Sequence, residues 1–333
     1  MKREEWVDTL KGIGILLVIV GHTNSPFFKL IYGFHMPLFF MISGFLYNEE
    51  SAKKIGVINS IKKDAKRYLY PYFILSGLNL IISFLFELLK NGVSVSLFNM
   101  TGKWMFGIFW SYGNVAYLPN CTPLWFFVGL FVARIFLYFI LKLRSNTYRI
   151  SACIGFVMVD YCLSIVPHMK LPWNIDAAMI GCVCMYAGYT LRKFFFQKVR
   201  RPSLINGVAL CLLGFTFIML NGNVAVLPNQ LANPILFWGG ALLTSAGLII
   251  CSSNLKINSV FLQKLGWSSA IVMGLNYVVR DLIRNMWVEF NFWTLQSCPW
   301  YVEAVTTTVV LFLIAQVWNL VKHKYRILER TYI

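Results

Sequence analysis

The chain has 333 residues, of which 58% are hydrophobic, 17% aromatic and only 13% charged. Soluble domains average about one quarter charged residues, so this composition excludes an ordinary soluble protein and indicates one that crosses a membrane several times. The formal net charge of +17 would suit a nucleic-acid-binding protein, but the positions of the basic residues along the chain argue against that class.

Apolar runs of about 17–25 residues have the length that crosses a bilayer as one helix. The chain contains ten such runs, at residues 8–24, 30–47, 69–89, 123–141, 150–166, 174–191, 204–221, 232–251, 267–288 and 300–321. The run 267–288 is the least lipid-like because it carries Arg280, Asp281 and Arg284, so one side of it must face protein or water. We therefore expect an all-α membrane protein with about ten transmembrane helices, organised as one integral-membrane domain over residues 1–333.

The lysines and arginines are divided unequally between the two sides of the membrane that these runs define. If the N-terminus lies inside, most of the 30 basic residues fall on the inner side, and the outer side holds Lys29, Lys90, Lys103 and Lys170. This is the positive-inside pattern, so both termini are predicted to be cytoplasmic and no nucleic-acid partner is expected. The N-terminal MKREEW enters the first run without a small-residue cleavage site, so no signal peptide is predicted either.

The first run, WVDTLKGIGILLVIVGHT, carries ionisable residues that a lipid-facing helix does not need. Lys11 and His22 are separated by close to three turns of an α-helix, which would place both on one face, about 16 Å apart. Ionisable groups at such depth usually face a polar interior and mark function. A neutral imidazole accepts protons near neutral pH, so His22 is a candidate general base toward a hydroxyl group. The alternatives are a structural histidine at 22 and an interfacial anchor at Lys11.

The second run opens with Phe34-His35-Met36-Pro37 and continues to Ser43-Gly44. His35 lies near the outer side and is equally suited to hydrogen-bond a polar substrate or to cap its helix. Ser43-Gly44 predicts the close approach of another helix, because small residues let two helix backbones come together.

A basic segment, KKDAKRYLYPY at residues 62–72, leads into the third apolar run. Lys63, Lys66 and Arg67 cluster within one helical turn beside the membrane, and clustered cations bind phosphate groups. They are candidate contacts for a cytosolic phosphorylated donor. The simpler interpretation is ordinary positive-inside charge or contact with lipid headgroups.

Other candidates are spread along the rest of the chain. The outer connection from about Lys90 to Thr122 is rich in aromatic residues and suits an interfacial helix or a roof over a cavity. Trp125, which opens the fourth run, and Asp176, at the outer start of the sixth, are candidate substrate contacts. Asp176 can equally orient a histidine or be interfacial. Arg134, inside the fourth run, needs a carboxylate or a cavity, because an unpaired arginine there is costly.

The eight cysteines show no paired Cys/His spacing, so no metal site is expected. Most of them lie inside apolar runs and suit small core residues. Cys121 and Cys298 fall outside the runs, and the sequence leaves open whether they form a disulfide.

Six stretches follow one another over nearly the whole chain: DTLKGIGILLVIVGHT, FHMPLFFMISGFL, KRYLYPY, PLWFFVGLF, NIDAAMIGCVCMYAGYTLRK and LGWSSAIVMGLNY. In this order they resemble the acyltransferase-3 family of integral membrane acyltransferases, and within it the fucose-4-O-acetylase-like branch. The first two stretches are together the most specific. The resemblance implies a ten-helix core that passes an acyl group, usually acetyl, from cytoplasmic acyl-coenzyme A to a hydroxyl of an envelope glycan or lipid-linked sugar.

The resemblance also implies roles for individual residues. The family's basic residue and essential histidine map onto Lys11 and His22, and its R-x-x-R pair, implicated with the coenzyme, falls near Lys63 and Lys66, with Arg67 adjacent. Lysine replaces arginine at 11, 63 and 66, so the charge survives and bidentate recognition is lost.

Two further positions depart from the family pattern. Arg67 aligns about as well as Lys66 with the second arginine of the pair, in which case Asp64 stands first. Asn276 replaces a histidine of many relatives, so an acid–base role is not expected there.

Together these observations predict an O-acetyltransferase of the bacterial inner membrane, with acetyl-coenzyme A as donor and an envelope polysaccharide or its lipid-linked precursor as acceptor. His22 would activate the acceptor hydroxyl or take part in an acyl relay, and Lys11 would hold a phosphate or stabilise negative charge. The alternative is a glycan or lipid transporter of the same architecture. A membrane scaffold or sensor would leave Lys11 and His22 on one helix face unexplained.

Overall fold

The computed structural model describes residues 4–114, 116–118, 121–165, 171–196, 202–227, 229–290, 292 and 298–331. This part of the chain forms twelve α-helices, with an isolated β-bridge between Ala225 and Gln230. The α-helices are α1 (Glu5–Gly21), α2 (Phe28–Phe45), α3 (Glu49–Asn91), α4 (Val95–Trp110), α5 (Trp125–Lys142), α6 (Asn146–Ile165), α7 (Ile175–Leu191), α8 (Leu204–Leu220), α9 (Pro234–Leu255), α10 (Val260–Trp267), α11 (Ser269–Glu289) and α12 (Trp300–Thr331). Short turns, η1 (Thr122–Leu124), η2 (Pro172–Asn174) and η3 (Arg192–Phe196), flank α5 and α7.

Each of the ten predicted apolar runs lies on one of these helices, so the all-α class is confirmed. Among the described helices, six are long and apolar enough to cross a membrane: α2, α3, α5 with η1, α6, α9 and α12. The chain is therefore a multi-pass membrane protein. α8 is apolar but has 17 residues, and α11 carries the charges that made its run the least lipid-like. Crossings by α1, α7, α8 and α11, and the side on which the termini lie, stay predictions.

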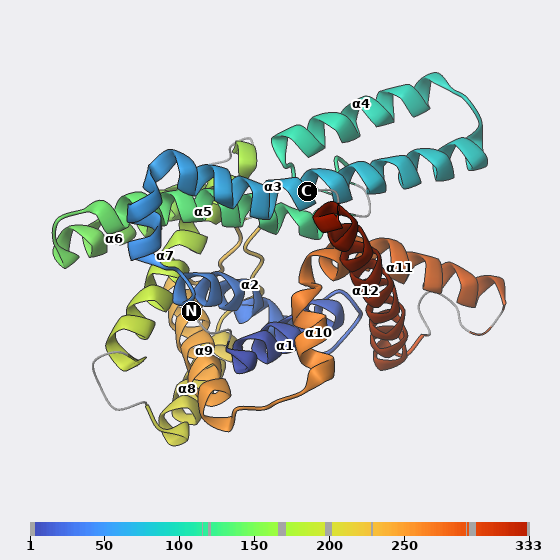
Figure 1. Cartoon of the computed structure of the whole chain (residues 1–333). Helices are drawn as coiled ribbons and strands as arrows, with labels where there is room; N and C mark the ends of the chain where they lie inside the picture. Colours follow the sequence, from blue (N-terminus) through green and yellow to red (C-terminus); the bar gives the residue numbers. More distant parts are fainter. Residues whose placement is uncertain are drawn as a thin grey trace.

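The third helix is longer than its apolar run. α3 begins at Glu49, so the basic segment 62–72 is helical and continuous with the apolar part. The helix kinks at Gly56, whose φ of 79° lies in the left-handed region that glycine adopts without strain. α4 packs beside the second half of α3, and the two project beyond the other helices (Figure 1). The aromatic connection after Lys90 therefore contains a regular helix, α4.

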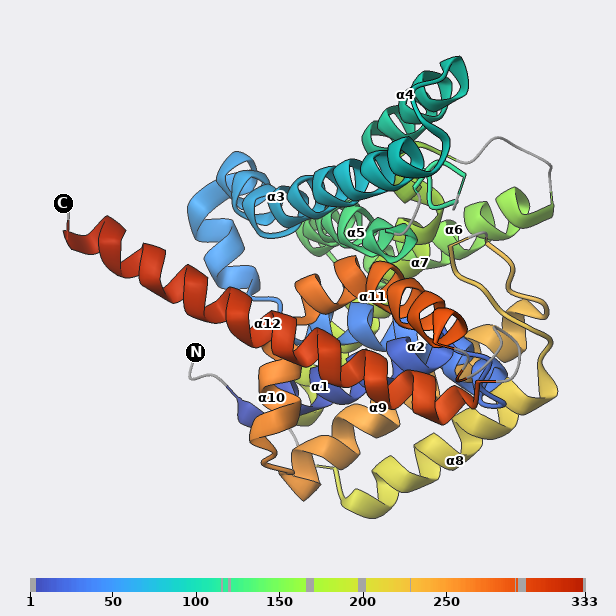
Figure 2. The same ribbon diagram turned by 90° about the vertical axis from the view of Figure 1, so that its right-hand side faces the viewer.

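The centre of the molecule is α2, most of whose side chains are buried. It packs against α1, α7 and α9, and Figure 2 shows it enclosed by the surrounding helices. At Gly44 a β-carbon would lie 1.9 Å from the Met185 carbonyl oxygen, and at Gly188 it would lie 2.0 Å from the Met41 carbonyl oxygen. The close helix approach predicted at Ser43-Gly44 is thus confirmed, and α7 is the helix that approaches.

This contact gives a stability prediction. We expect Gly44→Ala to lower the free energy of unfolding by about 3 kcal/mol or more, because the added methyl group meets backbone that cannot move aside. Gly77→Ala on α3 is the matched control, since a β-carbon there has nothing within 4 Å. Thermal unfolding of the two purified variants in detergent measures the difference. Equal melting temperatures would contradict the packing described here.

Candidate active site

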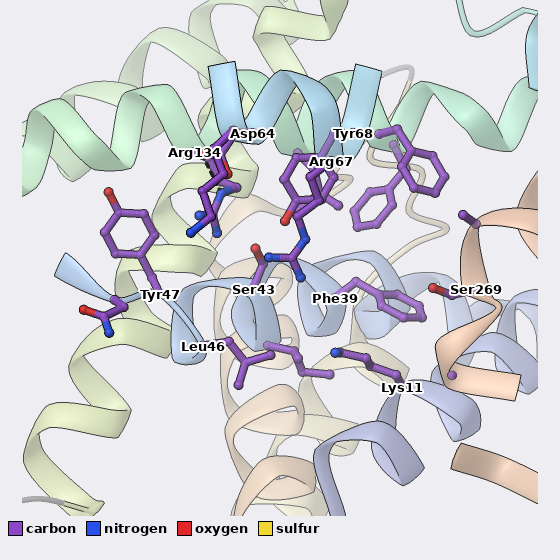
Figure 3. Close-up of a pocket in the computed structure, with 18 of the residues that line it drawn as sticks. Lys11, Phe39, Ser43, Leu46, Tyr47, Asp64, Arg67, Tyr68, Arg134 and Ser269 are labelled. Carbon is purple, nitrogen blue, oxygen red and sulfur yellow. Dashed lines mark ion pairs between the residues drawn. The ribbon is translucent and has the colours of Figure 1, made fainter. Parts of the chain in front are cut away.

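A cavity of about 430 Å³, the inner cavity, lies between the first half of α1, the end of α2, the basic part of α3, α5 and α11. Its charged lining consists of Asp8, Lys11, Lys63, Asp64, Arg67 and Arg134. Figure 3 shows Lys11 and Arg67 reaching into it from different walls, α1 and α3. Four cations therefore face two carboxylates, and the inner cavity has an excess of positive charge.

Helix periodicity decides which residues of the basic segment reach the inner cavity. Ser60, Lys63, Asp64, Arg67 and Tyr68 line it, at the three- and four-residue spacing of one helix face. Lys66 is not among the described residues that line this cavity, although Lys63, Lys66 and Arg67 are all exposed. The structure thus brings Lys63 and Arg67 together with Lys11 and leaves Lys66 outside the group.

Two charged residues of the inner cavity, Asp64 on α3 and Arg134 on α5, form an ion pair with each other. Arg134 Nε lies 2.9 Å from Asp64 Oδ2, and both side chains are largely buried. The Arg134 guanidinium also lies over the rings of Tyr47, at 4.9 Å, and Tyr68, at 5.8 Å. Arg134 was expected to need a carboxylate or a cavity, and it has both: Asp64 on α3 is its partner, and the two side chains line one side of the inner cavity (Figure 3).

The Arg134–Asp64 pair has a measurable consequence for stability. We expect Arg134→Ala to cost about 3–5 kcal/mol of unfolding free energy, because it leaves the Asp64 carboxylate buried without its cation. Lys53→Ala is the control: it breaks the Lys53–Glu49 pair, in which the lysine side chain is 57% exposed, and should cost less than about 1 kcal/mol. Unfolding of both variants by heat or denaturant tests this. Losses of similar size would show that burial of the pair has no such effect.

His22 follows the last residue of α1 and is held by residues from two other helices. Its Nδ1 lies 3.2 Å from the Tyr32 hydroxyl on α2 and 3.3 Å from the Tyr277 hydroxyl on α11. Arg280 Nη1 donates a 2.8 Å hydrogen bond to the His22 carbonyl oxygen, and its guanidinium lies 4.4 Å from the centre of the Tyr277 ring. His22 is thus held both at its imidazole ring and at its backbone carbonyl group.

A second cavity, the histidine cavity, has a volume of about 140 Å³ and contains three of the predicted site residues. His22, His35 and Trp125 line it, together with Tyr32 and Tyr277. His35 Nδ1 makes a 2.8 Å hydrogen bond with the Ile31 carbonyl oxygen one turn earlier in its own helix. His35 therefore does not cap α2, because it lies inside the helix and its Nδ1 bonds a carbonyl group of the preceding turn. Its ring lines the histidine cavity, and contact with a polar substrate there stays a prediction.

Shared lining residues show that three cavities are neighbours, with the histidine cavity in the middle. Met273 on α11 lines both the inner and the histidine cavity. His22, Tyr32 and Tyr277 line both the histidine cavity and a third space of about 450 Å³, the outer vestibule. The imidazole of His22 consequently stands between the histidine cavity and the outer vestibule, and Met273 stands between the histidine cavity and the charged inner cavity.

Comparison with known protein families identifies the family of this chain. The family model described as "Acyltransferase domain", that of the acyltransferase-3 family, matches residues 4–318. The chain belongs to this family.

Two curated relatives match a short part of this chain. Nodulation protein NolL of Sinorhizobium fredii (strain NBRC 101917 / NGR234) is 46% identical over 13% of this chain and 16% of the relative. Nodulation protein NolL of Mesorhizobium japonicum (strain LMG 29417 / CECT 9101 / MAFF 303099) is 50% identical over 12% of this chain and 14% of the relative. The match therefore spans about one sixth of the relatives' length or less. No solved structure matches this chain.

Three other residues singled out in the sequence, Cys121, Asp176 and Cys298, lie outside the described lining of these three cavities. Asp176 is buried at the start of α7, where Oδ1 accepts a 2.9 Å hydrogen bond from the Ala177 backbone, and it does not appear in the described lining of the three cavities. Cys121 and Cys298 are free thiols, so the disulfide that the sequence left open is absent from the structure.

Sequence reasoning did not place Tyr32, Tyr277 or Arg280 beside His22. Tyr32 and Tyr277 are ordinary in an apolar helix, and nothing in their spacing from His22 identifies them. Arg280 was recognised as a charge that needs a polar neighbour, and the structure supplies several: the His22 carbonyl oxygen, Asp281 at 2.9 Å and Glu303 at 3.9 Å. A charged residue on an apolar helix was the signal, but its partner on α1 was not predictable.

Proposed function

We infer that the chain is a membrane O-acyltransferase, an O-acetyltransferase that uses acetyl-coenzyme A and acylates a hydroxyl of a cell-envelope polysaccharide or lipid-linked sugar. The observation that carries this proposal is the row of cavities. The inner cavity at one end is cationic, and His22 lines the outer vestibule at the other end. We place the protein in the cytoplasmic (inner) membrane, with both termini and the inner cavity on the cytoplasmic side, as the positive-inside pattern predicts.

The inner cavity has the chemistry that an acyl-coenzyme A donor requires. Lys11, Lys63 and Arg67 reach it from α1 and α3, and phosphate groups are bound by such clustered cations. Lys11 also lies 3.6 Å from Asp8, which fixes the direction of its side chain. These residues would hold the phosphates at the wide, charged end, so that the acyl end points along the cavities toward His22.

The acceptor side is formed by the outer vestibule. Asn24, Ser25 and Phe28 line it together with His22 and Arg280, so it offers polar groups and an aromatic face to a sugar. His22 takes the proton of the acceptor hydroxyl, whose oxygen forms the new ester bond as the carbon–sulfur bond of the thioester breaks. The same imidazole returns the proton to the departing thiolate. A relay through an acyl-enzyme would use the same residues in two steps.

The proposal is tested by transfer of label from acetyl-coenzyme A. Membranes that contain the full chain are incubated with acetyl-labelled donor and envelope material from cells that lack the gene. We expect alkali-labile label in a glycan or lipid-linked sugar fraction, and none with membranes that lack the chain. Failure to find such label in any envelope fraction, or movement of glycan across the membrane without donor, would favour the transporter instead.

A further inference from the structure

A groove separate from the row of cavities runs between α6 and α7. Its volume is about 650 Å³, and its lining includes Arg149 and Ile150 of α6 together with Tyr189 of α7 and Lys193 and Phe194 of η3. None of its described lining residues lines the inner cavity, the histidine cavity or the outer vestibule. The proposed transfer reaction therefore does not explain it.

The position of α6 shows what surrounds this groove. Only 11% of the apolar window of α6 is buried inside the structure, and the helix lies at the edge of the molecule (Figure 1). A helix of this hydropathy with so little protein around it faces the acyl chains of the bilayer. The groove between α6 and α7 is therefore open to lipid along its apolar part.

The polar end of the groove is positively charged. Arg149 is anchored by its Nε to the Leu143 carbonyl oxygen at 3.1 Å and by Nη2 to the Leu141 carbonyl oxygen at 2.7 Å. Among the described residues these bonds leave Nη1 without a protein acceptor. Lys193 Nζ lies 5.7 Å from the centre of the Tyr189 ring and forms no ion pair within the described part of the chain. The groove thus has two cations at one end.

One carboxylate near the groove does not cancel both charges. Glu49 accepts a hydrogen bond from the Tyr189 hydroxyl and interacts electrostatically with Arg149, but it also pairs with Lys53 at 2.6 Å, so its single charge is shared between two cations. The apolar part of the groove is formed by Ile150 and Phe194, whose side chains are 51% and 55% exposed. Exposed apolar side chains beside two cations match an acyl chain attached to an anionic headgroup.

We propose that the α6–α7 groove is a binding site for an anionic phospholipid, whose phosphate is held by Arg149 and Lys193 and whose acyl chain lies along Ile150 and Phe194. This site is independent of the proposed transfer reaction. It would add a lipid-mediated contact to the direct packing of the peripheral helix α6 on α7.

Native mass spectrometry of the full chain in detergent tests the site. The protein is titrated with dioleoyl-phosphatidylglycerol and, separately, with dioleoyl-phosphatidylcholine. We expect the anionic lipid to bind about tenfold more tightly, and Lys193→Glu to remove that preference, because each cation near a headgroup favours anionic lipid by a factor of several. Ile150→Gln, at an exposed position, should weaken binding of both lipids without removing the preference.

Lys54→Glu is the matched control, because Lys54 is an exposed lysine of α3 outside the groove and its substitution changes the net charge equally. This variant should bind phosphatidylglycerol as the unaltered chain does. Equal binding of the two lipids would overturn the proposal, as would the same loss in Lys54→Glu as in Lys193→Glu. Displacement of the lipid by millimolar glycerol 3-phosphate would show a soluble phosphate site and would overturn the assignment to lipid.

Discussion

Replacing His22 by alanine should reduce kcat for acyl transfer about 10³-fold, while the variant folds and still binds acetyl-coenzyme A. The reason is that a positioned general acid–base contributes about 10²–10⁴ to a rate, and His22 stands between the histidine cavity and the outer vestibule. The measurement is transfer of labelled acetyl groups in proteoliposomes, with the melting temperature and donor binding recorded for the same preparation. Transfer at the unaltered rate would remove His22 from the mechanism.

A smaller change around the same imidazole separates catalysis from packing. Tyr277→Phe keeps the aromatic contact with His22, whose ring centre is 5.0 Å away, and deletes the hydroxyl 3.3 Å from Nδ1. We expect kcat to fall about tenfold with KM for the donor unchanged, since one hydrogen bond of about 1 kcal/mol or somewhat more orients the ring. A purely structural tyrosine would instead change the melting temperature and leave kcat unaltered.

The helices and the central histidine were predictable because they depend on local features. An apolar run long enough for a bilayer must satisfy its backbone hydrogen bonds internally, so its helical form follows from composition alone. Lys11 and His22 were recognisable as polar residues in such a run. Arg134 was predictable in the same way as a residue in need of a partner, but Asp64 as that partner was not, because the pair joins α3 to α5.

What the sequence did not contain is the rotation of each helix about its own axis. Lys63, Lys66 and Arg67 are equivalent as charges in a basic segment, and only the packing of α3 against α5 decides that Lys66 faces away. The residues around His22 could not be predicted for the same reason. Tyr277 and Arg280 come from α11, more than 250 residues later in the chain, and their approach is set by how α11 packs on α1.

The rotation of α3 about its axis gives Arg67 and Lys66 different expected effects on donor binding. Arg67→Ala should raise KM for acetyl-coenzyme A about tenfold and leave kcat nearly unchanged, because a charge-assisted hydrogen bond to phosphate is worth about 1.5–3 kcal/mol and is lost equally from ground and transition states. Lys63→Ala should act in the same direction. The measurement is the initial rate of transfer as a function of donor concentration.

Lys66→Ala is the control that the fold supplies, because it removes the same charge from the same turn of α3 but from outside the inner cavity. If the donor were attracted only by the general positive charge of this segment, Lys66→Ala and Arg67→Ala would raise KM equally, and more strongly at low salt. A site inside the cavity instead predicts a large effect for Arg67 and almost none for Lys66. The ratio of the two KM values therefore decides whether the cations of α3 bind the donor directly or only make this side of the membrane positive.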